Sequence, residues 1–419
     1  MNELLKQVRV LDPSSQTDRV ADVLITDSIV TAVEDAIADY PSNSTIYEGS
    51  GLILAPGLVD LYSHSGEPGF EERETLKSLK RAAAAGGFTR VTILPDTDPA
   101  LDNLASLAWL HDQSKAISPN SIPSLQPWAA LTLEVKGQQI TELAELATAN
   151  IAGFADGKPL QLIMVRRLLE YLHPFGKPVM LWAWDRELVG NGVMREGLDS
   201  MQIGLPGIPA IAETAALAAL LECIEAIGTP VHLMRISTAR GVELIRNAKE
   251  RGLPITASTS WMHLLLNTQM IASYDPNLRL NPPLGTPGDQ AALIDAVQQG
   301  VIDAIAIDHT PYTYEEKTVP FAEAPPGAIG LELALPLLWH RFVASGLWTA
   351  IELWSALSTR PAICLQQQPP AIANGQPAEM ILFNPQQCWI AKAASLKSSA
   401  SNTFWLNQDI QGQVIKIWC

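Results

Sequence analysis

The sequence lacks the features that mark several common protein classes. Its four cysteines, Cys223, Cys364, Cys388 and Cys419, include no C-x-x-C pair, which argues against a disulfide framework and predicts free, buried thiols in a reducing compartment. No apolar run reaches the roughly 18 residues that a membrane-spanning helix needs. The N-terminus has no apolar signal-peptide core. These absences predict a cytoplasmic protein.

Basic residues are also scarce, with 28 Lys and Arg against 44 Asp and Glu, giving a net charge of −16. This balance argues against nucleic acid or an anionic membrane as a partner and would suit a partner with a basic face. Apolar residues make up 47% of the 419 residues and charged residues 17%. A chain of this size and composition can form one large domain, or a barrel with a smaller module.

The middle of the chain alternates between strand-like and helix-like stretches. The eight expected strands are Leu58–Tyr62, Thr89–Leu94, Trp128–Leu133, Ile151–Phe154, Val179–Trp182, Val231–Ile236, Ile255–Ser258 and Ala304–Ile307. The expected helices between them include Glu74–Ala85, Gln161–Leu172, Ile211–Ile227, Gly241–Arg251 and Asp289–Gln299. Their number and order predict an α/β fold of the (β/α)8 TIM-barrel type. A doubly wound sheet would more naturally carry a Gly-rich phosphate loop after its first strand, and none is present.

Both ends of the chain instead read as short strands rich in β-branched residues and separated by turn residues. We expect the two ends to meet in one small β-sandwich domain, residues 1–54 plus 362–419, beside a barrel of residues 55–361.

In such a barrel, functional side chains follow the carboxyl ends of the strands. The stretch Asp60–Gly69 follows the first strand and contains half of an acid-x-His-x-His pattern, with Tyr62 at the first histidine position and His64 at the second. The other strand ends supply Asp96, Asp156, Trp182, Arg235, Trp261 to His263, and Asp308 with His309.

Several motifs in these regions resemble the dihydroorotase family of the amidohydrolase superfamily. They are Pro56–Gly69, Ala85–Pro99, Gly192–Gly197, Gly207–Glu213, Asn281–Leu284, Ile307–Tyr312, Glu315–Lys317 and Gly330–Pro336. The resemblance covers almost the whole chain in order. It implies a (β/α)8 barrel with an appended β-sandwich, and a reaction in which one or two zinc ions activate water while an aspartate shuttles the proton.

Carried over position by position, the family's metal centre is largely replaced. Its four histidines fall on Tyr62, His64, Trp182 and Arg235, so that only His64 is retained. Its bridging acid falls near Asp156, and its catalytic aspartate falls on Asp308, which is either a retained proton shuttle or a vestige of one. Indole and guanidinium groups offer no lone pair to a metal at neutral pH. We therefore predict no bound metal, and hypothesise that Arg235 takes the place of the cation and pairs with Asp308.

The resemblance also places substrate-binding positions in this chain. Asn281 and His309 are retained, whereas the carboxylate-gripping arginine of the family falls on Gly66 and an asparagine falls on Asp96. An acid at position 96 would repel a carboxylate substrate.

These replacements leave two functional hypotheses. The first is a catalytically degenerate member that resembles the non-catalytic dihydroorotase-like proteins associated with aspartate carbamoyltransferase, with self-association as a further possibility for its contacts. The alternative is an active, diverged zinc enzyme that interconverts N-carbamoyl-L-aspartate and dihydroorotate, or another cyclic-amide hydrolase. Zinc would be the cofactor only in the alternative.

Overall fold

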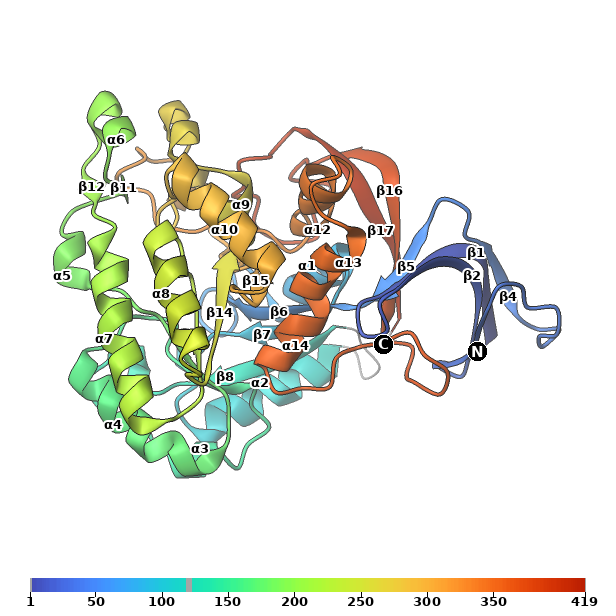
Figure 1. Cartoon of the computed structure of the whole chain (residues 1–419), viewed down its shortest axis with the longest axis horizontal. Coiled ribbons are helices and arrows are strands. Elements are labelled where there is room, and N and C mark those ends of the chain that lie inside the picture. Colours follow the sequence, from blue (N-terminus) through green and yellow to red (C-terminus); the bar gives the residue numbers. More distant parts are fainter. Residues whose placement is uncertain (1, 118–122, 419) are drawn as a thin grey trace.

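The computed structural model describes residues 2–117 and 123–418, and its centre is a barrel of parallel strands (Figure 1). Neighbouring strands pair in chain order. The barrel strands of the described chain are β6 (Leu58–Ser63), β7 (Phe88–Ile93), β8 (Ser124–Ala129), β9 (Gly153–Ala155), β10 (Val179–Leu181), β13 (Val231–Leu233), β14 (Ile255–Ser260) and β15 (Ala304–Ala306). The predicted fold class is therefore confirmed.

The barrel closes where the last strand meets the first. The backbone N–H of Asp308 donates to the carbonyl of Tyr62 at 3.1 Å, and that of His64 donates to the carbonyl of His309 at 2.8 Å. The Asp60 carboxylate, which is fully buried, also accepts from the backbone N–H of Ile307 at 2.9 Å. Burial raises the pKa of Asp60 to about 7. Asp60 thus ties the two strands together.

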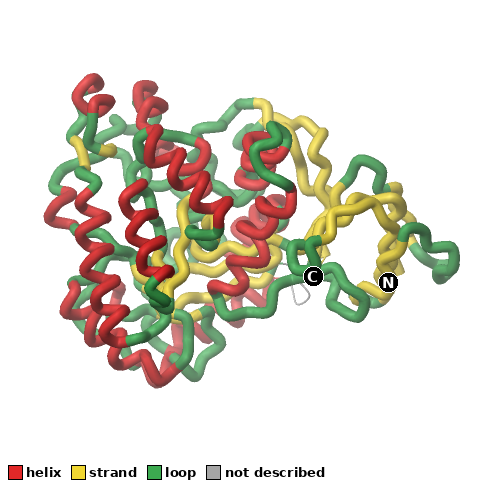
Figure 2. The backbone as a smooth tube through the Cα atoms, in the orientation of Figure 1, coloured by secondary structure: helices red, strands yellow, loops and turns green. Residues whose placement is uncertain are grey.

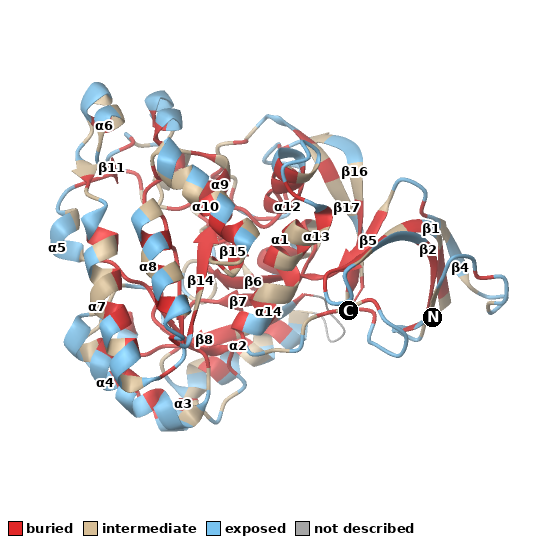
Figure 3. Cartoon of the chain, in the orientation of Figure 1, coloured by how far each residue is buried: buried red, intermediate tan, exposed pale blue. Residues whose placement is uncertain are grey.

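Helices cover the outside of the barrel, as the red tube in Figure 2 shows. The longer ones are α1 (Leu76–Gly86), α2 (Leu104–Ile117), α4 (Leu162–Leu172), α7 (Ile211–Ile227), α8 (Ala239–Glu250) and α10 (Pro287–Gln299). The shorter ones are α3 (Leu143–Leu146), α5 (Arg186–Val189), α6 (Leu198–Ile203), α9 (Trp261–Leu265), α11 (Tyr314–Lys317), α12 (Ala334–Leu338), α13 (Ala350–Trp354) and α14 (Arg360–Cys364). A small parallel pair, β11 (Met194–Arg195) and β12 (Gly207–Ile208), lies among the loops. Figure 3 shows the barrel strands buried and the outer helix faces exposed.

The two chain ends form a second, curved sheet beside the barrel, on the right in Figure 1. Its strands are β1 (Asn2–Asp12), β2 (Thr17–Thr26), β3 (Ile29–Glu34), β4 (Thr45–Glu48), β5 (Ile53–Pro56), β16 (Met380–Ile390) and β17 (Asp409–Trp418). β5 pairs with β1 on one side and with β16 on the other, which joins the N-terminal and C-terminal segments. Buried apolar side chains from several of these strands, including Leu5, Val23 and Met380, form one cluster.

Some expected boundaries differ from the structure for identifiable reasons. The strand expected at Trp128–Leu133 is β8, Ser124–Ala129, and it ends early because the backbone N–H groups of Leu131 and Thr132 donate to the Asp156 side chain. Helix α10 begins before Asp289 because Thr286 caps it and Pro287 occupies its first turn.

The described cysteines are unpaired, but the expectation that they are buried holds only for Cys364. Cys223 is half-buried and Cys388 is exposed, while Cys419 lies outside the described residues. Within residues 2–117 and 123–418, no helix is long and apolar enough to cross a membrane.

Candidate functional site

A cavity of about 250 Å³ opens where the barrel strands end. The side chains that follow these ends converge on it, although they come from five different strands. They are His64 after β6, Asp96 after β7, Trp182 after β10, Arg235 after β13 and Asp308 after β15. The structure therefore brings together most of the residues singled out in the sequence.

Arg235 occupies the centre of the site. Its guanidinium donates to both carboxylate oxygens of Asp308, with Nη2 at 2.6 Å and Nε at 2.8 Å. Nη1 donates to the carbonyl of Gly157 at 2.9 Å. Burial works against the charged guanidinium, but the charge and hydrogen bonds of Asp308 outweigh burial and raise the pKa of Arg235. The expected pairing of Arg235 with Asp308 is present.

Aromatic rings hold this guanidinium in place. The Arg235 carbon Cζ lies 4.9 Å from the Trp182 ring centroid and 5.6 Å from that of Tyr62. Trp184 stacks on Trp182 with ring centroids 5.4 Å apart. The Tyr62 hydroxyl accepts from the backbone N–H of Arg235 at 3.1 Å, and burial raises the pKa of that hydroxyl, so it remains protonated. Two replaced histidine positions thus serve as packing surfaces for a cation.

His64 is held between an acid and this cation. Its Nδ1 lies 2.9 Å from Asp96, and its Nε2 lies 3.2 Å from Arg235 Nη2. A guanidinium can only donate, so Nε2 accepts, and Nδ1 carries the hydrogen that is donated to Asp96. Burial disfavours the Asp96 carboxylate, but contact with His64 outweighs it and lowers the pKa of Asp96 to about 2. The lone pair that a metal would use is therefore directed at Arg235.

Asp156 lies away from this cluster. Its carboxylate is buried and accepts from the backbone N–H groups of Leu131 at 2.7 Å and Thr132 at 3.1 Å, and from the Thr132 hydroxyl. Burial raises the pKa of Asp156 in spite of these donors. Asp156 fixes the loop after β8 and is not among the residues that line the cavity.

The predicted substrate-binding residues do not all lie at the cavity either. Asn281 lines the cavity, whereas His309 does not. A Cβ on Gly66 would lie 2.5 Å from the carbonyl oxygen of Phe70 and 2.4 Å from that of Glu74, so the local backbone leaves no room for the arginine of the family.

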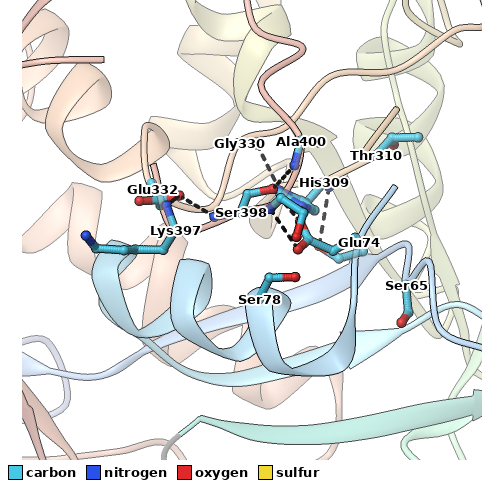
Figure 4. Close-up of polar contacts among 12 residues, drawn as sticks. Ser65, Glu74, Ser78, His309, Thr310, Gly330, Glu332, Lys397, Ser398 and Ala400 are labelled. Carbon is cyan, nitrogen blue, oxygen red and sulfur yellow. Dashed lines mark hydrogen bonds and ion pairs between the residues drawn. The ribbon is translucent and has the colours of Figure 1, made fainter. Parts of the chain in front are cut away.

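His309 instead belongs to a buried polar cluster, which Figure 4 shows. Its Nδ1 accepts from the backbone N–H of Gly330 at 3.2 Å, and its Nε2 lies 3.4 Å from the Glu74 carboxylate. Glu74 also accepts from the Ser398 hydroxyl. Both ring nitrogens are engaged within the protein, and the cluster ties the barrel to the segment that leads into β17.

The residues present do not fit the zinc centre that the family resemblance implies. His64 and Asp308, the two positions of the family's metal centre that keep a ligand-type residue at the cavity, both bond to the Arg235 guanidinium, which lies between them. No group of three or more His, Cys, Asp or Glu side chains among the described residues is arranged to hold a metal. A catalytic zinc site needs three such ligands and would be repelled by the buried Arg235 charge.

Sequence reasoning missed one side chain at this site, Lys158. It lines the cavity and makes no hydrogen bond or ion pair with another described residue. Lys158 lies two residues beyond Asp156, a strand-end residue already singled out, and that spacing is the signal that could have identified it. Trp184, which the sequence also makes prominent beside Trp182, extends the aromatic stack outward.

Comparisons with known proteins agree with this architecture. Residues 51–240 match the family model described as dihydro-orotase-like. The chain is 46% identical to a probable dihydroorotase-like protein from Synechocystis sp., covering 98% of each chain, and 36% identical to a dihydroorotase from Pelobacter propionicus, covering 99% of this chain and 97% of that one. An L-hydantoinase from Arthrobacter aurescens superposes with a TM-score of 0.84 at 18% identity, covering 99% of this chain and 94% of that one, which shows the shared fold. The chain belongs to the dihydroorotase family.

Proposed function

We propose that this chain is a dihydroorotase-like protein of pyrimidine biosynthesis that holds no catalytic zinc, does not turn over dihydroorotate, and acts as a structural partner of aspartate carbamoyltransferase. One observation carries the catalytic part of the proposal. The Arg235 guanidinium bonds to Asp308, His64 and the carbonyl of Gly157 at the place where the family keeps its metal.

The chemistry of that arrangement supports a site without catalytic activity. A metal lowers the pKa of its bound water and so supplies hydroxide at neutral pH, whereas a guanidinium has no vacant orbital with which to bind water. Both oxygens of Asp308 accept hydrogen bonds from Arg235, so this carboxylate cannot take a proton from water without losing a buried ion pair. The guanidinium at the metal position and the aspartate that would shuttle the proton are therefore bonded to each other.

The partner part of the proposal has separate support. The chain aligns with 98% of the length of its Synechocystis relative, while the residues at its site differ from the metal ligands that the family resemblance implies. A net charge of −16 suits a partner that presents a basic face.

Two measurements on the purified full-length protein test the proposal. Elemental analysis after dialysis against zinc should find much less than one equivalent, and assays in both directions should find no turnover, with the Pelobacter propionicus dihydroorotase as the positive control. Size-exclusion chromatography with aspartate carbamoyltransferase from the same organism should show co-elution. One zinc per chain with turnover would overturn the silent site. Separate elution would overturn the partnership alone.

A further inference from the structure

A cleft runs from the cavity at the strand ends toward the outer helices. Three adjoining cavities of about 250, 310 and 1000 Å³ compose it, and Lys158 and Trp182 line all three. The middle cavity is bounded by Lys158, Arg186, Asn281, the two tryptophans 182 and 184, and two apolar residues. The widest cavity lies along α4 and α7.

The side chains that line the middle cavity carry a net positive charge. It is lined by two cations, Lys158 and Arg186, and by no carboxylate, in a chain that carries 16 more acidic than basic residues. Neither side chain forms an ion pair or hydrogen bond with another described residue. Lys158 interacts electrostatically at longer range with Asp96 and Asp156. Both of these acids already form hydrogen bonds with other residues.

A hydrogen-bond donor is also unsatisfied here. Trp182 is only 7% exposed. Its indole N–H is buried and has no hydrogen-bond partner among the residues that the structure describes. Buried donors are rarely left unpaired in folded proteins. Asn281, in the wall of the same cavity, offers an amide that no described residue engages. The lining of the cavity therefore offers two cations and a free amide, with a buried, unpaired indole N–H on one of its tryptophans, and contains no carboxylate.

The walls indicate the rest of the ligand. Trp184, Trp182 and the Arg235 guanidinium stack in that order, so the cleft has a flat, rigid side. On its outer side it opens into a larger groove lined by Leu160, Leu162 and Ile163. The acids of that groove, Asp185 and Glu187, lie outside the middle cavity, and Asp185 caps α5 through two backbone N–H groups.

We propose that this cleft binds a small organic anion, with its carboxylate or phosphate group between Lys158 and Arg186 and its body along the tryptophan wall. The proposal does not depend on catalytic silence or on a protein partner. Because the Trp182 ring also contacts Arg235, a ligand here would touch the group that fills the former metal position.

Isothermal titration of the full-length protein tests the proposal with three probes: inorganic phosphate, succinate and uridine 5′-monophosphate. We expect saturable binding of at least one probe. Lys158→Gln and Arg186→Gln should each weaken it about tenfold, as expected for the loss of one charged contact. Trp182→Phe, which keeps a ring but removes the N–H, should weaken it several-fold.

Arg240→Gln is the matched control, because it removes one exposed charge from α8 far along the chain from the cleft residues. It should leave binding unchanged. Preference for uridine 5′-monophosphate over phosphate would assign the site to a phosphorylated metabolite, and preference for succinate would assign it to a carboxylate. If no probe saturates, the proposal is wrong. Phosphate binding that both cleft variants retain would mean an adventitious ion only and would equally overturn it.

Discussion

The strongest test of the role of Arg235 at the site is its replacement by methionine. Met keeps an unbranched apolar stem against Tyr62 and Trp182 but removes every donor. The substitution deletes two charged hydrogen bonds to Asp308 and one each to Gly157 and His64. It also removes the guanidinium counter-ion of the Asp308 carboxylate, whose side chain is 14% exposed, and leaves the His64 Nε2 atom, 3.7 Å away, as the nearest ionisable group.

The size of the effect follows from these contacts. Removing one partner of a buried ion pair typically costs about 3–5 kcal/mol, because the remaining charge stays desolvated. Partial exposure of Asp308 places the expected loss near the lower end, at about 3 kcal/mol. The positive φ of Arg235, 59°, is as unfavourable for Met as for Arg, so backbone strain does not alter the difference.

Urea unfolding at pH 7 measures this loss as a lower midpoint at unchanged slope. Arg235→Met combined with Asp308→Asn should cost less than the sum of the two single changes, since the second removes the stranded charge. Arg166→Met is the control, because its pair with Glu170 is exposed on α4 and should contribute less than about 0.5 kcal/mol. An Arg235→Met protein as stable as this control would refute the view that the guanidinium holds the site together.

Three further predictions concern the metal, the pH dependence and the backbone of the site. The combined change Tyr62→His, Trp182→His and Arg235→His should restore only partial zinc binding and no turnover, because Asp156 faces the loop and Gly66 holds no carboxylate; one zinc per chain with dihydroorotate hydrolysis would contradict this. Burial raises the pKa of Glu332 from 4.5 to about 7, so the native chain binds a proton that the unfolded chain lacks between these values, and the free energy of unfolding should fall by about 3 kcal/mol as pH rises through them. Glu332→Gln, which can still accept from the backbone N–H groups of Lys397 and Ser398, should reduce the fall in urea midpoint between pH 5 and 7.5 and leave the part that Asp60 contributes, whereas the exposed Glu170→Gln should not change it; equal slopes for wild type and Glu332→Gln would contradict the assignment. Gly66→Ala should lower stability by about 1–3 kcal/mol through contact with two backbone carbonyls, and an unchanged midpoint would show that this loop can open.

The sequence by itself determined the barrel, the family and the chemical character of the site. Alternating strands and helices have periodicities that are set locally, so the eight barrel strands could be placed to within a few residues. The identities Trp182 and Arg235 were enough to predict that two of the family's ligand positions offer no lone pair to a metal, because that capacity belongs to the residue type.

Only the tertiary structure decided where the side chains point and which groups they meet. Arg235 and Asp308 are 73 residues apart, and they pair because β13 and β15 lie on either side of β14 in the barrel. The closure between the last strand and the first places His309 beside Glu74. Asp156 turns to the backbone of Leu131 because a buried carboxylate needs donors, and the nearest ones lie in that loop. Sequence spacing carries no information about such long-range partners.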